Sequence, residues 1–136
     1  MSIPVAIGAK ASLTKRITAQ DVETFAEISG DRNPVHLDDE YASTTPFKKR
    51  IAHGALTSAL ISAVLGQHLP GQGTIYLSQN AKFKAPVYLD DEITATVEVT
   101  DYREDKRITT LKTDVYNQHD TLVLTGEAVV IAPEQN

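Results

Sequence analysis

The fold of this chain is decided by residues 52–67, which read AHGALTSALISAVLGQ. Small and apolar side chains recur there at spacings of three and four, at Ala55, Leu56, Ala59, Leu60, Ala63 and Val64. That period is the period of an α-helix, and a helix that is apolar on most sides is a buried one. We therefore expect a long central helix over residues 52–67, against which other backbone can pack closely.

The second half of the chain alternates apolar and polar residues, as half-buried strands do. Apolar residues occupy every second position over 93–99, and similar alternation runs over 107–117 and 121–131, with turns near Glu104-Asp105 and His119-Asp120. A long apolar helix followed by such a meander predicts an α+β fold in which an antiparallel sheet curls around the helix. No repeat or linker interrupts the sequence, so we expect a single domain over 1–136.

An additional helix is expected near the N-terminus, over about residues 19–29. Thr18-Ala19-Gln20-Asp21 resembles a capping box, and Gly30 is a suitable C-terminal stop. The next residues, Asp31-Arg32-Asn33-Pro34, predict an ordered loop, because proline keeps the residue before it out of helical geometry. A polar segment over 38–43 is expected to make a helical turn.

Asp31 and His36 carry the chemistry of this loop. A carboxylate and an imidazole five residues apart, joined by a rigid Asn-Pro turn, can converge if the loop folds back, and together they can hold and deprotonate a water molecule. Taken alone, the pair has an ordinary alternative, in which Asp31 caps a turn and His36 is a structural histidine. The surrounding sequence favours the catalytic interpretation.

A longer string around the pair resembles a known motif. Residues 25–36 read FAEISGDRNPVH, with Ala42 six residues on, and they closely resemble the hydratase motif of the MaoC-like dehydratase family, which has the hot-dog fold. Residues 51–54, IAHG, and residues 83–91, FKAPVYLDD, resemble two further landmarks of that family. The usual glycine of the second landmark is Asp90 here, a departure that bears on local turn geometry and not on catalysis. The chain looks most like the short (R)-specific enoyl-CoA hydratases that supply (R)-3-hydroxyacyl-CoA for polyhydroxyalkanoate synthesis.

The resemblance implies an activity and a role for particular residues. The substrate would be a trans-2-enoyl-CoA, with Asp31 and His36 binding the water and Asp31 acting as the base. The backbone N–H of Gly54, at the start of the apolar helix, is suited to meet the negative charge that develops on the thioester oxygen, since a helix N-terminus has free N–H groups and a favourable dipole. The alternative for Gly54 is tight packing. The resemblance also implies a homodimer whose joined sheets build the substrate tunnel.

Four more residues are candidates for contact with the substrate. Asn33 either orients Asp31 and the water or simply forms the turn. Ser58 and Ser62 share a helical face with the start of the helix and are expected to line an acyl pocket, unless they are buried serines bonded to preceding helical carbonyls. Leu65 is expected to close the tunnel against longer acyl chains.

No metal or other cofactor is expected. Asp31, His36, Asp38 and His53 offer metal-binding groups by composition, but no two of the histidines fall at i, i+4 on one helix. His53 is instead expected to tie the start of the central helix to a neighbouring carbonyl. Activity should need neither added metal nor nicotinamide.

Charge and composition narrow the choice of partners and location. A net charge of −5 argues against nucleic acid, and the small basic clusters Lys48-Lys49-Arg50 and Lys82 with Lys84 can at most meet one phosphorylated cofactor. No stretch approaches roughly 18 consecutive apolar residues, and no charged leader precedes an apolar run, so we expect no membrane span and a cytoplasmic location. The absence of cysteine excludes disulfides and a cysteine acyl-enzyme.

Two other functions compete with hydration. A hot-dog thioesterase typically places a carboxylate on or near the central helix, but residues 51–68 contain no Asp or Glu. A non-catalytic acyl-binding subunit needs the pocket but neither acid nor base, so the presence of Asp31, Asn33 and His36 together argues against it.

Overall fold

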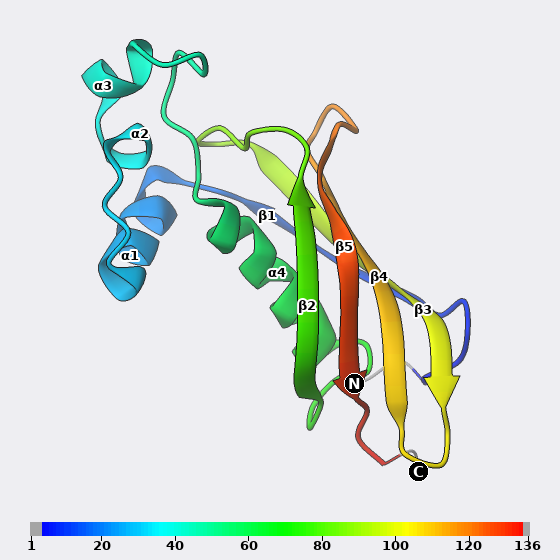
Figure 1. Ribbon diagram of the computed structural model, residues 1–136. Helices are drawn as coiled ribbons and strands as arrows, with labels where there is room; N and C mark the ends of the chain where they lie inside the picture. The colour runs from blue at the N-terminus through cyan, green and yellow to red at the C-terminus, as the bar shows by residue number, and fades with distance from the viewer. Residues whose placement is uncertain (1–3, 135–136) are drawn as a thin grey trace.

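The computed structural model describes residues 4–134, and it shows an antiparallel sheet bent around one long helix (Figure 1). The strands lie in the order β1-β3-β4-β5-β2, and their bounds are β1 Lys10–Arg16, β2 Ile75–Phe83, β3 Glu92–Arg103, β4 Ile108–Tyr116 and β5 Leu122–Ile131. Helix α4 (Gly54–Gln67) packs against the sheet. Helices α1 (Ala19–Ser29), α2 (Pro34–Leu37) and α3 (Asp39–Ser43) project beyond it. The α+β hot-dog fold is confirmed.

The core lies between α4 and the sheet, where the two predicted periodicities meet. The inward residues of β3, from Ile93 to Val99, are almost completely buried, and they belong to one apolar cluster with Leu60, Ile61 and Val64 of α4. The central helix begins two residues later than expected, at Gly54. Ala52 lies outside the helix, and its N–H donates to the Val87 carbonyl at 2.7 Å.

The N-terminal helix has the ends that the sequence predicts. Thr18 and Asp21 form the capping box at the start of α1, and Gly30 ends the helix in the left-handed conformation at φ 79°. Pro34 then begins α2 directly after the Asn33 cap, and the expected turn over 38–43 is α3. Two helix boundaries therefore bracket Asp31, which limits how far its carboxylate can move.

The turn before β3 tolerates an aspartate in the position where the family has glycine. Asp90 adopts φ 70°, a left-handed conformation that aspartate accepts more readily than most residues. Its N–H donates to the Ile17 carbonyl at 2.6 Å, and the Asp91 carboxylate accepts from the Tyr88 N–H at 2.9 Å. The turn therefore forms, and the departure from the family pattern leaves it in place.

The two outer strands, β1 and β2, were not singled out by the sequence patterns. β2 forms one edge of the sheet and, among residues 4–134, pairs only with β5. Its apolar residues Ile75, Leu77 and Phe83 are each more than half exposed. An edge strand with exposed apolar side chains is a surface on which another chain can pack.

Candidate active site

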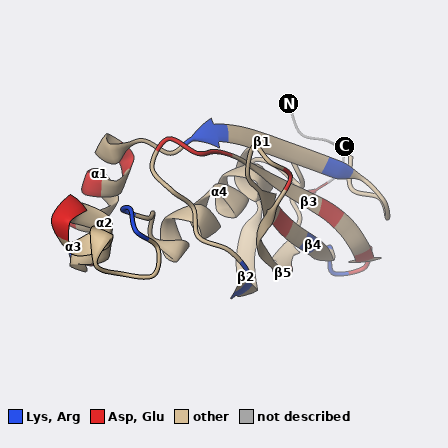
Figure 2. Cartoon of the chain, turned by 90° about the horizontal axis from the view of Figure 1, so that it is seen from above, with Lys and Arg blue, Asp and Glu red and all other residues tan. Residues whose placement is uncertain are grey.

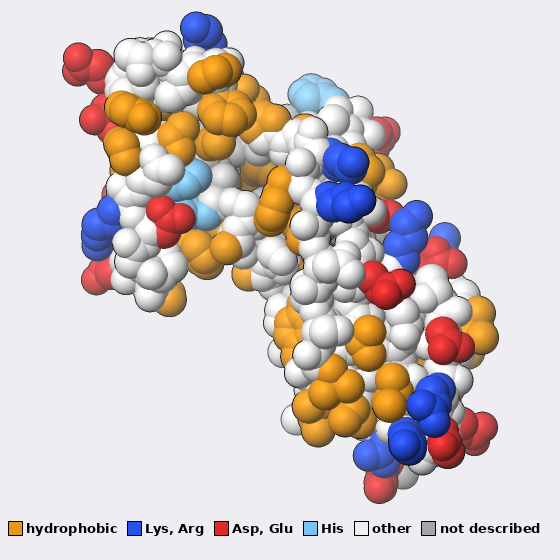
Figure 3. Space-filling model, viewed as in Figure 1, with side chains coloured by type: hydrophobic (Ala, Val, Ile, Leu, Met, Phe, Trp, Pro, Cys, Tyr) orange, Lys and Arg blue, Asp and Glu red, His pale blue; other side chains and the backbone are white. Residues whose placement is uncertain are grey.

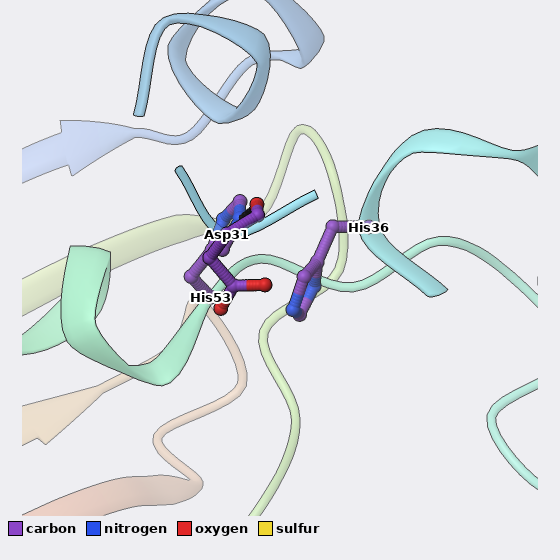
Figure 4. A group of neighbouring side chains, drawn as sticks. All are labelled: Asp31, His36 and His53. Carbon is purple, nitrogen blue, oxygen red and sulfur yellow. Dashed lines mark hydrogen bonds between the residues drawn. The ribbon is translucent and has the colours of Figure 1, made fainter. Parts of the chain in front are cut away.

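Asp31 and His36 converge on one point, as the loop between α1 and α2 folds back (Figure 4). Ligand atoms of Asp31, His36 and His53 all lie within 4.8 Å of one another. Asp31 is exposed, whereas His36 is 8% and His53 1% exposed. The site thus has an accessible carboxylate set against two buried imidazoles.

Local hydrogen bonds hold Asp31 in place. The Asp31 N–H donates to the Ser29 hydroxyl at 3.1 Å, and the carboxylate accepts from the Asn33 N–H at 3.2 Å. The Asn33 side chain does something else, since its oxygen accepts from the Val35 N–H and caps α2. Of the two roles open to Asn33, the structure thus shows the turn-forming one for its side chain, while its backbone orients Asp31.

The tautomer of His36 follows from its neighbour. Nδ1 lies 2.7 Å from the Ile51 carbonyl oxygen, which only accepts hydrogen bonds, so Nδ1 carries the proton. The other nitrogen, Nε2, is then an acceptor while the ring is neutral. Burial lowers the pKa of His36 below its ordinary value of 6.5, and His53 adds to that shift, while the Ile51 carbonyl and Asp31 oppose it. His36 is therefore a neutral acceptor at pH 7.

His53 connects the loop to the start of α4. Its Nε2 lies 3.0 Å from the Asp31 carbonyl oxygen, so Nε2–H is the donor. The ring stacks on His36 with centroids 3.9 Å apart and contacts the ring of Phe25 at 4.9 Å. The expected tie to a neighbouring carbonyl is confirmed, and the carbonyl belongs to Asp31.

Asp31, His36 and His53 are candidates for a metal site, because the fold brings their side chains together although they are separated along the sequence. The His36 and His53 rings stack with planes only 29° apart, so the lone pairs in those planes run side by side and do not converge on one ion. One nitrogen of each ring is already engaged by a backbone carbonyl. Asp38, the fourth group considered, accepts from Tyr41 N–H and caps α3. The geometry suits a held water better than a metal.

A cavity of about 930 Å³ opens beside this cluster. Figure 3 shows the hollow between the projecting helices and the sheet, with histidine and apolar side chains at its surface. Its wall is mostly apolar and is built from α4, both ends of β2 and the segment 84–87, with His36, Phe47 and Ile51 on the loop side. Such a cavity fits an acyl chain with one polar end.

The N-terminus of α4 meets the cavity at Gly54 and Ala55. The N–H groups of these first helical residues have no acceptor within the helix, and no acceptor is found for them among residues 4–134. A β-carbon on Gly54 would lie 2.7 Å from Cε1 of Phe83, so packing also requires glycine here. Both interpretations of Gly54 therefore have support.

Ser58 and Ser62 line the cavity on the same side of α4 as Gly54. Neither hydroxyl bonds a preceding helical carbonyl in the described part of the chain, so the buried-serine alternative does not hold. Leu65 is different: it is 2% exposed, packs in the apolar core and is absent from the cavity wall. Helical phase does not explain this, because at about 100° per residue Leu65 returns to within about 20° of Gly54 around the helix axis. The part of α4 that lines the cavity ends at Ser62, one turn before Leu65. The role of Leu65 in chain length stays a prediction.

Three aromatic residues of the cavity wall were not anticipated. Phe47, Tyr76 and Phe83 all line it, and each is more than a third exposed. Tyr76 and Phe83 lie on β2, the edge strand, and the Tyr76 hydroxyl donates to the Gln79 side chain. The sequence did contain a signal for them. The apolar residues of β2 do not alternate with polar ones, which is typical of a strand with contacts on both faces.

Comparisons with known proteins agree with this geometry. The family model described as MaoC like domain matches residues 5–122. An (R)-specific enoyl-CoA hydratase of Aeromonas caviae is 53% identical, covering 93% of this chain and 95% of its own. A protein of the same description from Rhodospirillum rubrum is 48% identical and covers 93% and 87%. The solved (R)-hydratase from A. caviae involved in PHA biosynthesis superposes with a TM-score of 0.92 at 52% identity, over 95% of this chain and 98% of that one.

Proposed function

This chain belongs to the MaoC-like domain family, and we propose that it adds water to the 2,3 double bond of a trans-2-enoyl-CoA to give the (R)-3-hydroxyacyl-CoA. The observation that carries the proposal is the pairing of Asp31 with a neutral His36 beside the cavity, in a chain 53% identical to a hydratase of that specificity. The reaction is a hydro-lyase reaction, and the reverse dehydration uses the same groups.

The mechanism follows from the acceptors and donors at the cavity: His36 and Gly54 line its wall, and the Asp31 carboxylate lies beside His36. The Asp31 carboxylate and the His36 Nε2 both accept, so they hold one water by its two hydrogens and leave its lone pair for attack on C3. Asp31 takes one proton as the C3–O bond forms, and the other proton stays on the new hydroxyl. The C2 carbanion then recovers the proton from the same face, which makes the addition syn.

The start of α4 stabilises the negative charge that develops on the thioester oxygen. As the C2–C3 electrons move toward the carbonyl, the oxygen becomes negative, and the Gly54 N–H donates to it. The positive end of the α4 dipole lies at this position, and no carboxylate on α4 opposes it. The acyl chain runs along α4 past Ser58 and Ser62. A thioesterase is disfavoured, because α4 offers no carboxylate aimed at the carbonyl carbon.

The active unit is proposed to be a homodimer joined through β2. Ile75, Leu77 and Phe83 on this edge strand are 55%, 51% and 58% exposed, and Tyr76 and Phe83 also line the cavity. Pairing the two β2 edges buries this apolar surface and closes the open side of the cavity. Among residues 4–134, no helix is long and apolar enough to cross a bilayer. Location in the cytoplasm stays a prediction.

The test of the catalytic pair uses crotonyl-CoA, followed by the absorbance of its conjugated double bond and by a free-thiol assay. Wild type should bleach the absorbance without releasing thiol, whereas a thioesterase releases thiol and a binding subunit does neither. Asp31→Asn and His36→Gln should each slow hydration by at least about a hundredfold with the fold intact. Because both act on one water, the double variant should lose much less than the product of the single losses. Near-normal turnover in both single variants contradicts the assignment.

A further inference from the structure

A short basic segment lies next to the cavity and has no acidic partner. Lys48, Lys49 and Arg50 follow one another between α3 and α4, and none of their side chains pairs with a carboxylate within residues 4–134. Figure 2 shows Lys and Arg on this segment, while the neighbouring α1 and α3 carry Asp and Glu. Clustered cations that form no ion pair repel one another, so their arrangement suits an anionic ligand.

These cations line a pocket formed by the same two chain segments, 47–51 and 84–89, that contribute residues to the wall of the reaction cavity. The pocket has a volume of about 290 Å³ and is lined by Lys48, Lys49, Arg50, Tyr88, Leu89 and the acidic Asp39. The flanking residues Phe47 and Ile51 line the cavity, as does the segment 84–87 that precedes Tyr88. The two segments are joined by an isolated β-bridge between Ile51 and Tyr88. This bridge holds together the two segments whose residues line the cavity and the basic pocket.

Two of the cations are held in place before any ligand binds. Arg50 donates from Nε to the His36 carbonyl at 2.7 Å, and its two terminal nitrogens have no acceptor among the described residues. Lys49 places Nζ 4.9 Å from the ring centre of Tyr88, whose hydroxyl donates to the Phe47 carbonyl at 3.0 Å. Fixed donors lose little conformational entropy when they bind an anion, so preorganisation strengthens the site. A planar guanidinium with free terminal nitrogens is suited to phosphate oxygens.

We propose that Lys48, Lys49 and Arg50 bind the phosphate groups of the coenzyme A nucleotide while the thioester is held at Gly54. The inference rests on the proposed function, because it takes the thioester end of the substrate to lie in the cavity. Coenzyme A carries its diphosphate and its 3′-phosphate at the far end of the pantetheine arm from the thioester. Three cations against the one carboxylate of Asp39 leave a net positive charge that matches these groups.

A nucleotide fits this site better than a carrier protein does. The basic residues form one small pocket, and acidic residues lie close by, including Asp39 and Glu40 on α3. The chain as a whole has a net charge of −5, so it lacks the extended basic surface that would attract an acidic carrier protein. A compact pocket that holds phosphate oxygens is what a nucleotide requires.

The experiment compares thioesters with and without the nucleotide. Hydration of crotonyl-CoA and of crotonyl-pantetheine is measured for wild type and for Lys48→Gln/Lys49→Gln, two exposed positions at which substitution leaves the core untouched. The matched control is Lys10→Gln/Lys112→Gln, which removes the same charge from the sheet. Adenosine 3′,5′-bisphosphate serves as a competing nucleotide, and crotonyl on an acyl carrier protein as a third substrate.

The expected result is a KM for crotonyl-CoA that rises about tenfold more than the KM for crotonyl-pantetheine, with kcat for crotonyl-CoA nearly constant. Inhibition by the bisphosphate should weaken by a similar factor, and the wild-type KM should depend more steeply on salt than that of the variant. The proposal is overturned if KM changes equally for both thioesters or if the control variant shows the same effect. It is also overturned if only the carrier-protein substrate is affected. Failure of the proposed function is distinguishable, since wild type then hydrates neither small thioester.

Discussion

Replacing Gly54 by alanine separates the two roles proposed for this residue, donation to the thioester oxygen and close packing against Phe83. The added β-carbon would lie 2.7 Å from Cε1 and 3.1 Å from Cδ1 and Cζ of Phe83. Contacts this short cannot persist, so the ring has to move by about 1 Å to reach ordinary van der Waals separation. Phe83 is 58% exposed at the end of β2, which leaves its ring room to turn away.

The expected cost in stability is small. Overpacking a tight core costs about 1 to 3 kcal/mol, and the exposed ring places this case at the low end. Alanine in place of glycine favours the helix by up to about 1 kcal/mol, which offsets most of that cost. Gly54→Ala should therefore shift Tm by about 4 °C or less.

The expected cost in activity is larger. Loss of one donor to a developing oxyanion typically lowers kcat by about 10²- to 10³-fold. In Gly54→Ala the N–H remains, but the added methyl group enters the cavity wall beside it and displaces the thioester oxygen of the substrate. We expect kcat for crotonyl-CoA to fall by about tenfold to a hundredfold, with a smaller change in KM, because the interaction strengthens in the transition state.

The assay is a double-mutant cycle with Phe83→Ala, in which kcat and Tm are measured for all four proteins. Removing the ring removes the three atoms that the new β-carbon meets. If Gly54 donates to the thioester oxygen, adding alanine at position 54 still lowers kcat in the Phe83→Ala background. If the loss disappears there, Gly54 serves only to accommodate the ring, and the assignment of its N–H to the oxyanion is refuted.

Three other predictions concern pH, chain length and assembly. Because burial lowers the pKa of His36, kcat/KM should stay constant down to pH 6.5 and fall only at lower pH. The free energy of unfolding should rise with pH between the lowered pKa and 6.5, because the unfolded chain binds the extra proton in that range. A fall in kcat/KM centred above pH 6.5 contradicts this prediction. Leu65→Ala should raise kcat/KM for an eight-carbon enoyl-CoA relative to crotonyl-CoA, whereas a flat ratio with about 2 to 5 kcal/mol of lost stability shows that Leu65 is ordinary core. Sedimentation should give a species near twice the chain mass of 14.8 kDa, and Leu77→Asp on β2 should shift it toward the monomer with loss of activity; a fully active wild-type monomer excludes the proposed dimer.

The interior of the fold could be predicted from the sequence, but its edges could not. The helix α4 and strands β3, β4 and β5 each bury one face against the same core, so their apolar residues repeat with the period of the element. β2 has no such period, because its apolar residues Ile75, Tyr76 and Leu77 are consecutive and all exposed within one chain. We propose that its pattern reflects contacts with a second copy of the chain, as in the dimer proposed above.

Chain-local features of the site were predictable and long-range ones were not. Asp31 and His36 are held by bonds to near neighbours such as Ser29 and Asn33, and proline and glycine in the sequence mark that loop. The pairing of His36 Nδ1 with the carbonyl of Ile51 depends on tertiary structure, and so does the tautomer that follows from it. The argument against a metal site from the sequence was incomplete for the same reason. It used the spacing of histidines along the chain, whereas Asp31, His36 and His53 are brought together by the tertiary structure.

The buried ring of His53 lies between the Asp31–His36 pair and the start of α4. His53 is the residue immediately before Gly54 and the N-cap of α4. Its Nε2–H donates to the carbonyl of Asp31, and its ring stacks on His36. Because the ring is 1% exposed and cannot turn without breaking these contacts, the Asp31–His36 pair and the Gly54 N–H are held at a fixed separation. Addition of water to C3 requires that separation, since the attacked carbon and the thioester oxygen belong to one rigid conjugated group.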